Sequence, residues 1–306
     1  MRLRRGRPDL ARYADRFDVP EATGDFAVTF LGVSTVLLDD GETAALTDGF
    51  FSRPSLARVA LGRIAPDEAR IDAALRRAGI DRLAVVAPVH THFDHAMDSP
   101  AVVRRTGAVL AGGSSAAQVG RGAGLPEDRI RVVSPGEPQA FGDFRLTWLE
   151  SEHCPPDRYP GTIEAPVVPP ARAGAYQCGE AWSILVEHAS GRTALVQGSA
   201  GFRPGALAGR QADVAYLGVG QLGVQDRAYL RAYWAETVEA TGAREVVLLH
   251  WDDFFQPLHL PLRALPYAGD DLDVTMEVLG DLARRQRVGL HLPTLWRRED
   301  PWRSAG

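Results

Sequence analysis

The segment His90-Thr91-His92-Phe93-Asp94-His95 decides how this chain is interpreted. It places four candidate metal ligands within six residues and contains three of the eight histidines in the sequence. Positions 90 and 92 can point to one side of an extended loop, while 94 and 95 turn to the other. Imidazole combined with carboxylate favours ions such as Zn or Fe over Mg or Ca. The segment therefore predicts a site for one or two metal ions.

The residues before this segment predict where the site lies in the fold. Leu83–Val89 is continuously apolar, as expected for a strand that is covered on both faces. The charged motif begins directly after it. We therefore expect the polar chemistry at the carboxyl end of a buried strand.

Two further histidines follow predicted strands. His153 comes after the strand expected at Phe144–Leu149, and His250 comes directly after the apolar run Val246–Leu249, which ends the strand expected at Glu245–Leu249. A histidine in such a position is more often structural than functional. Because the motif at 90–95 needs more ligands to complete two sites, both histidines become candidates.

These residues resemble the metallo-beta-lactamase superfamily, whose signature His-x-His-x-Asp-His is met in full at 90–95. Within it, the chain is similar to the branch of N-acyl-phosphatidylethanolamine phospholipase D and the ascorbate-6-phosphate lactonases. Leu31–Leu38, Leu46–Asp48 and Val247–Phe254 carry the branch resemblance. The likeness covers about residues 26–265 and is most specific at the signature.

The resemblance implies a fold and a ligand set. The fold would be α/β, a four-layer αβ/βα sandwich with the metal site at one edge between the sheets. One metal ion would be held by His90, His92 and His153. The second would be held by Asp94, His95 and His250, of which Asp94 and His250 are the candidate catalytic residues.

The chain departs from the family pattern at Ser199. The family normally has an Asp at this position, after a Gly, and that Asp bridges both metal ions; here the pair is Gly198-Ser199. Without that negative charge, the second ion should bind more weakly, and a filled site should favour anionic substrate groups. Ser199 itself and Asp252, which lies two residues after His250, are further candidate ligands.

Other polar residues receive supporting roles. Asp48 and Asp98 are expected to orient ligand imidazoles rather than to bind metal. Cys154 is expected to pack in the interior, and a single bridge between it and Cys178 stays open. The three remaining histidines are interpreted as structural; they are His188, His259 and His291.

The remaining pattern alternates strands and helices over one domain at 26–306, preceded by an arm at 1–25. A helix is expected from Pro66 to Gly79, and a poorly patterned loop at Phe50–Ile64. The Pro-rich stretch Cys154–Gly179 is expected to be a long surface loop that shapes the binding pocket. We refer to it below as the Pro-rich loop.

Composition excludes several classes of protein. The chain has 306 residues, 45% hydrophobic and 24% charged, which are globular proportions. Its net charge of -5 argues against nucleic acid as the main partner, and no apolar run is long enough for a membrane span. All 34 basic residues are Arg, which indicates codon bias and a bacterial origin. The sequence predicts a cytoplasmic protein that acts on a small, anionic molecule and can form a homo-oligomer.

The predicted function is metal-dependent hydrolysis. A metal-bound hydroxide would attack an ester, lactone, amide or phosphodiester, with Zn as the expected metal and Mn or Fe as alternatives. Two other functions stay open at this point. One is a mononuclear iron or zinc enzyme with oxygenase or biosynthetic chemistry, and the other is a non-catalytic protein that binds metal or another ligand.

Overall fold

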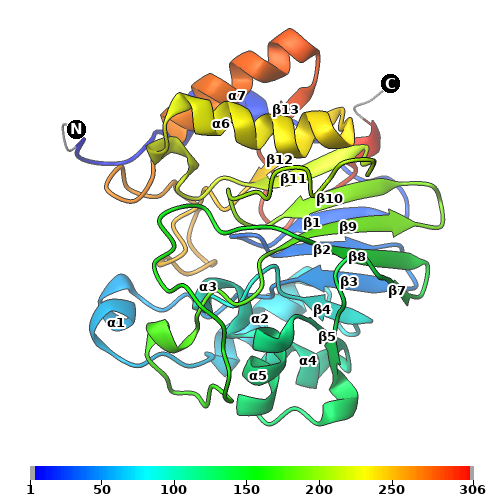
Figure 1. Cartoon of the computed structure of the whole chain (residues 1–306), viewed down its shortest axis with the longest axis vertical. Helices are drawn as coiled ribbons and strands as arrows, with labels where there is room; N and C mark the ends of the chain where they lie inside the picture. Colours follow the sequence, from blue (N-terminus) through cyan, green and yellow to red (C-terminus); the bar gives the residue numbers. More distant parts are fainter. Residues whose placement is uncertain (1–3, 304–306) are drawn as a thin grey trace.

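A computed structural model describes residues 4–303, in which two seven-stranded sheets face each other and helices cover their outer faces (Figure 1). The first sheet has the order β14 (Arg298–Glu299), β1 (Ala27–Phe30), β2 (Val36–Asp39), β3 (Ala44–Thr47), β4 (Val85–Ala87), β5 (Val109–Gly112) and β6 (Ile130–Val132). The second has the order β13 (Gly289–His291), β12 (Glu245–Leu249), β11 (Val214–Gly218), β10 (Thr193–Gln197), β9 (Trp182–His188), β8 (Phe144–Glu150) and β7 (Pro138–Phe141).

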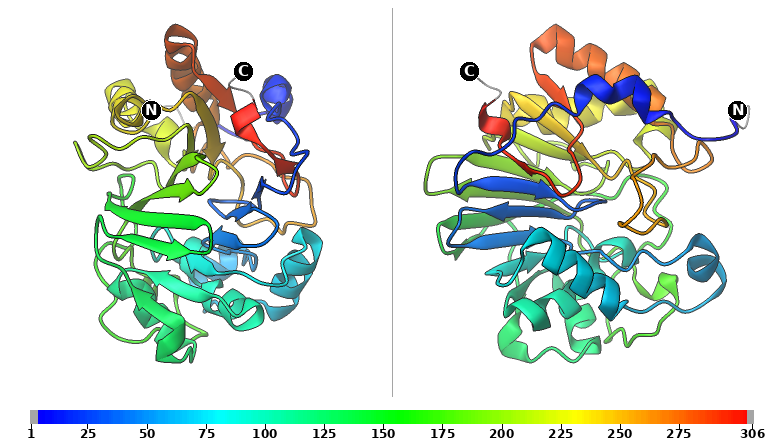
Figure 2. Two further views of the ribbon diagram at one scale, coloured as in Figure 1. Left: turned by 90° about the vertical axis from the view of Figure 1, so that its right-hand side faces the viewer. Right: turned by 180° about the vertical axis from the view of Figure 1, so that it is seen from behind.

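The helices form the two outer layers, as Figure 2 shows from two further sides. The first sheet is covered by α2 (Glu68–Ala78), α4 (Ser99–Thr106) and α5 (Ser114–Gly122). The second is covered by α6 (Arg227–Trp234), which continues as a π-helix at Ala235–Glu239, and by α7 (Leu272–Gln286). Two short helices, α1 (Leu56–Leu61) and α3 (Phe93–Ala96), lie at one end of the sandwich. The predicted four-layer αβ/βα sandwich is confirmed.

Alternation along the strands builds the two main cores. In β2, Val36 and Leu38 belong to the core between the sheets, whereas Leu37 packs in the core beneath α2 and α4. The strand β4 behaves in the same way, because Val85 and Ala87 face the inner core and Val86 faces the outer one. Strands of the first sheet are therefore covered on both faces, which explains why the segment before the signature is continuously apolar.

The predicted helix at 66–79 forms, with different bounds. Asp67 is its N-cap and accepts a hydrogen bond from the Arg70 backbone N–H, so α2 begins at Glu68. Gly79 ends it with a φ of 67°, the left-handed conformation that glycine adopts without strain.

Several short elements differ from the prediction. The loop expected at Phe50–Ile64 contains α1, which Ser55 caps by accepting from the Arg58 N–H. The strands β7, β13 and β14 were not predicted. They are two to four residues long and form at sheet edges, so their pairing is set by neighbouring strands rather than by a long local pattern.

Strand directions bring the predicted ligand segments to one edge of the second sheet. β9 is antiparallel to both β8 and β10, while β10, β11 and β12 run parallel to one another. The carboxyl ends of β8, β10 and β12 therefore share one edge, and these ends precede His153, Ser199 and His250.

Among residues 4–303, no helix is both long and apolar enough to cross a membrane. The first three and the last three residues, which belong to the expected arm and domain, lie outside the described part of the chain.

Candidate metal centre

His90, His92 and His153 form the first group of candidate ligands, which we call the three-histidine half. His90 follows β4, His92 immediately precedes α3, and His153 follows β8. Their ring centroids are 4.7–4.9 Å apart, and one nitrogen from each lies within 4.8 Å of the others. Three nitrogens at this spacing can bind a single ion.

Asp94, His95 and His250 form the second group, which we call the Asp94 half. Asp94 and His95 lie in α3, and His250 follows β12 directly. The Asp94 Oδ2 atom is 3.4 Å from His250 Nε2 and 3.7 Å from His95 Nε2. This group also satisfies the spacing needed to bind one ion.

The two halves touch each other through the rings of His90 and His95, whose centroids are 3.9 Å apart. His90 is 1% exposed, and neither of its ring nitrogens has a hydrogen-bond partner among residues 4–303. Buried polar atoms are nearly always partnered. A metal ion beside His90 would supply the missing partner, so the residues present fit the metal that the signature implies.

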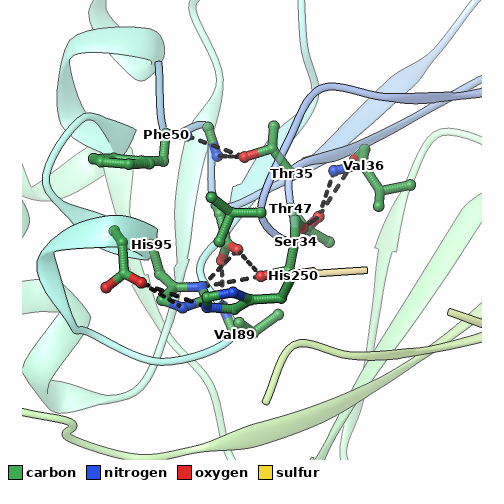
Figure 3. A network of polar contacts seen from close by, with 12 residues as sticks. Ser34, Thr35, Val36, Thr47, Phe50, Val89, His95 and His250 are labelled. Atoms are coloured by element: carbon green, nitrogen blue, oxygen red, sulfur yellow. Dashed lines mark hydrogen bonds and ion pairs between the residues drawn. The ribbon is translucent and has the colours of Figure 1, made fainter. Parts of the chain in front are cut away.

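Hydrogen bonds to Asp48 determine which nitrogen of His95 can face the metal. His95 Nδ1 lies 2.8 Å from Asp48 Oδ2 and 3.0 Å from Ser34 Oγ, and the Ser34 hydroxyl donates to the same carboxylate oxygen. Because the carboxylate accepts, Nδ1 carries the hydrogen and Nε2 is left free toward Asp94. Figure 3 shows the His95 and His250 rings side by side in this network. The predicted orienting role of Asp48 agrees with this contact.

Burial keeps His90 and His153 neutral. Burial, together with the neighbouring histidines, lowers the pKa of His90 well below its ordinary value and lowers the pKa of His153 to about 4. Neutral imidazole is the form that binds metal. His90 and His153 therefore need to lose no proton near neutral pH before they accept an ion.

The Asp94 half contains an ion pair instead. Burial alone would raise the pKa of Asp94, but His95 and His250 outweigh it and lower that pKa below the ordinary value. Burial would lower the pKa of His250, yet the hydrogen bond to Asp94 raises it. The carboxylate is therefore ionised and ready to act as a ligand.

Strained backbone surrounds the Asp94 half. Val33, Asp48, Arg53 and His250 all have φ between 43° and 58°, although none is glycine. The His250 N–H donates to the Val33 carbonyl oxygen at 2.7 Å, which ties the end of β12 to the turn between β1 and β2. Such conformations persist only where the surrounding contacts enforce them, and they concentrate at functional sites.

Asp252 helps to hold this left-handed backbone in place. Its Oδ2 atom pairs with Arg53 Nη2 at 2.6 Å, and its Oδ1 atom accepts from the Val33 N–H at 2.9 Å. Both side chains of the ion pair are completely buried. With both carboxylate oxygens engaged, the structure does not bring Asp252 into either ligand group as the sequence suggested.

Ser199 lies next to the three-histidine half. Its Oγ accepts from the backbone N–H of Cys154, the residue after His153, at 2.9 Å. A Cβ on the preceding Gly198 would lie 2.0 Å from Val89, so glycine is required where β10 ends against the segment before the signature. Ser199 therefore offers a hydroxyl at the position where the resemblance implies a carboxylate.

Asp98 does not orient a ligand, contrary to the prediction. Its carboxylate accepts from the backbone N–H groups of Phe51 and Ser52 and from the Ser52 hydroxyl. It therefore holds the segment after β3 in place. Local sequence could not reveal this, because the partners lie more than 40 positions away.

The remaining candidates fall outside the two halves. His291 contacts Asp18 and Glu245, His188 contacts Asp40 and Ser190, and His259 is exposed. Cys154 and Cys178 are both buried free thiols, so the bridge left open above is not formed.

Two contacts of His92 were not predicted from the sequence. Asp157 and the backbone carbonyl of Tyr159, both in the Pro-rich loop, lie against His92 Nε2. An acid three residues after Cys154 was the only local signal, and nothing in the pattern linked it to position 92.

No protein-family model matches this chain, and no curated protein does. Solved structures do share its fold. One from Veillonella parvula, described as a possible metal-dependent hydrolase, is 14% identical with a TM-score of 0.56, covering 90% of this chain and 99% of that chain. Igni18, described as a metallo hydrolase from Ignicoccus hospitalis, is 13% identical with a TM-score of 0.51, covering 89% and 96%.

A third similar structure is CmlA from Streptomyces venezuelae, described as a diiron beta-hydroxylase. It is 14% identical with a TM-score of 0.53, and the match covers 90% of this chain and 54% of CmlA. At these identities the likeness concerns the fold alone. Because the fold carries both hydrolases and a hydroxylase, function has to be argued from the site.

Proposed function

We propose that this protein is a metal-dependent hydrolase with a two-metal centre. One observation carries the proposal: the three-histidine half and the Asp94 half meet through His90 and His95, and each offers three ligand atoms to one ion. The unpartnered nitrogens of His90 support it independently. Zn is the expected metal, with Mn or Fe as alternatives, because imidazole dominates the ligand set.

Each residue of the centre has a distinct task in the proposal. Metal ions at the two halves would activate water and polarise the bond to be broken. Asp94, which is ionised and lies between His95 and His250, would bind its ion and orient that water. His250, held close to Asp94, would keep the carboxylate in place and face the reacting atoms.

The substrate class follows from charge. Asp94 is the only carboxylate in the two ligand groups, and Ser199 adds none. Two divalent ions would therefore leave the centre strongly positive, which favours small molecules with an anionic group near the ester, lactone, amide or phosphodiester bond. The resemblance to the phospholipase D and lactonase branch supports a phosphodiester or a lactone.

Metal content tests the proposal directly. Protein purified without added metal is analysed by elemental mass spectrometry and assayed on a lactone and a phosphodiester, beside His90→Ala and His250→Ala. We expect about two ions per chain in the wild type, fewer in each variant, and hydrolysis that falls with metal content. Hydrolysis that is unchanged in both variants would contradict the proposal.

Ser199 favours one alternative, a mononuclear iron or zinc enzyme with non-hydrolytic chemistry. Without the bridging carboxylate, the Asp94 half binds its ion with one negative charge fewer than the family pattern provides. The diiron hydroxylase CmlA shows that this fold is not restricted to hydrolysis. About one ion per chain, especially iron, would favour this alternative, whereas no metal binding on titration would favour a non-catalytic binding protein.

A further inference from the structure

We propose that Asp157 is a positioning residue that fixes His92 for metal binding and thereby couples the Pro-rich loop to the three-histidine half. The inference rests on the proposed metal centre. It adds an outer residue to that centre and gives the loop a role besides shaping the pocket.

The contacts of His92 identify the hydrogen on its ring. His92 Nε2 lies 3.2 Å from Asp157 Oδ1 and 3.3 Å from the carbonyl oxygen of Tyr159. A carbonyl oxygen can only accept, so Nε2 carries the hydrogen and shares it with both oxygens. The lone pair of the ring is then on Nδ1, which leaves that atom as the metal-binding nitrogen.

Hydrogen bonds restrain the part of the Pro-rich loop that carries Asp157. Near the far end of the loop, the Cys178 carbonyl oxygen accepts from the Thr91 N–H at 2.8 Å and from the Thr91 hydroxyl at 3.0 Å. The Cys178 N–H in turn donates to the Tyr159 carbonyl at 2.8 Å. The loop is therefore hydrogen-bonded to the signature segment at Thr91, between the candidate ligands His90 and His92.

Local contacts also restrict the Asp157 side chain. Its Oδ1 atom accepts from the Tyr159 N–H at 3.0 Å in addition to facing His92. Because His92 is 6% exposed, few water molecules can compete for its ring nitrogens. The carboxylate thus reinforces the ring form of His92 that the Tyr159 carbonyl selects, and it makes the imidazole a more basic ligand.

Loss of an outer partner of this kind weakens metal binding by about 10- to 100-fold. The coupling is reciprocal, because a loop that improves metal binding must itself be stabilised by the metal. Metal binding is therefore expected to slow hydrogen exchange in the Pro-rich loop.

The test compares Asp157→Ala with Asp157→Asn in the full chain. Zn affinity is measured by competition with a chelator, and hydrogen exchange of residues 154–179 is followed with and without Zn. We expect Asp157→Ala to weaken the tighter site about 10- to 100-fold and to abolish the protection by Zn. Asp157→Asn, whose amide oxygen still accepts from Nε2–H, should fall between the alanine variant and the wild type.

Two control variants make the result specific. Glu164, an exposed acid in the same loop, tests the effect of charge alone, and Glu164→Ala should bind Zn as the wild type does. Cys178 lies close enough to His92 and Asp157 for the three to bind an ion of their own. Loss of a bound ion in Cys178→Ser would identify Asp157 as a ligand of that separate site and overturn the positioning role.

The remaining outcomes separate the two proposals. If the wild type binds Zn and Asp157→Ala binds it equally well, the positioning role is overturned while the metal centre stands. If the wild type binds no metal, the metal centre itself fails. Circular dichroism of both Asp157 variants confirms that they are folded before either conclusion is drawn.

Discussion

The two halves of the candidate metal centre are held in place by different means. The Asp94 half lies among buried segments with left-handed backbone and is supported by the Arg53–Asp252 ion pair and by Asp48. The three-histidine half contacts the Pro-rich loop, where Asp157 lies against His92. Buried contacts therefore hold the Asp94 half in place, whereas the three-histidine half is also supported by a surface loop.

This difference bears on the proposed two-metal centre. In that centre the lack of a carboxylate at Ser199 would weaken binding of the second ion, but a rigid set of ligands would lose little conformational entropy on binding it. The three-histidine half, in which burial keeps His90 and His153 neutral, contacts the Pro-rich loop instead. The first three predictions below test the two halves, and the last provides a reference histidine outside them.

The largest effect is expected when the buried ion pair beside the Asp94 half is broken. Arg53→Met leaves the Asp252 carboxylate buried without its partner, which should lower the free energy of unfolding by about 3–5 kcal/mol. Urea denaturation measures the change. As a control, Arg227→Met breaks an exposed pair with Glu277 and should cost less than about 1 kcal/mol. An equal loss of unfolding free energy in the two variants would show that the buried pair does not stabilise the structure around the Asp94 half.

The next effect concerns stabilisation by metal. Zn at about 100 times its dissociation constant should add about 2.7 kcal/mol to the free energy of unfolding. His90→Ala should lose most of that gain, because His90 is the three-histidine ligand in contact with His95. Denaturation with and without Zn measures it, and His259→Ala, at an exposed histidine outside both halves, serves as the control. Undiminished stabilisation in His90→Ala would contradict the assignment of this ligand.

A smaller change is expected from restoring the family carboxylate. Ser199→Asp should tighten the weaker metal site by about tenfold, or about 1.4 kcal/mol, because it adds a negative charge between two cations. Ser199→Asn has nearly the same shape without the charge and should leave the affinity near the wild-type value. Chelator competition measures both. If Asp and Asn have the same effect, the weakness of the second site does not come from the missing charge.

The smallest effect is expected at His291, which provides a reference histidine outside the centre. Burial alone would lower the pKa of His291, but hydrogen bonds to Glu245 and Asp18 outweigh it and raise the pKa above its ordinary value. Its protonated form therefore stabilises the fold. That contribution is fully present below about pH 6.5, the unfolded value, and is lost as pH rises through the folded pKa.

His291→Gln should remove this pH dependence. Unfolding free energies are measured in urea at several pH values, and the difference between wild type and variant should be greatest at low pH. A difference that stays constant or grows with rising pH would show that His291 is neutral in the folded state. The contrast with His90 is direct, because the carboxylates that partner His291 have no counterpart around His90.

Long, regular features of the sequence were reliable predictors. The alternating strands, the capped helix α2 and the apolar run before the signature follow from local pattern and cap chemistry. The sandwich was expected from the family resemblance. Short edge strands such as β14 were missed because neighbours, not local sequence, hold them. The role expected for Asp98 was wrong because its partners lie far along the chain.

The sequence by itself determined the six candidate ligands and the absence of a carboxylate at Ser199, since these depend on residue identity and spacing along the chain. Only the tertiary structure decided that Asp252 pairs with Arg53 and that Asp157 reaches His92, because those partners are 199 and 65 positions apart. The physical reason is that residue identity and spacing determine which ligand atoms the chain offers. The role of each charged or polar side chain depends on the groups that the folded chain brings into contact with it.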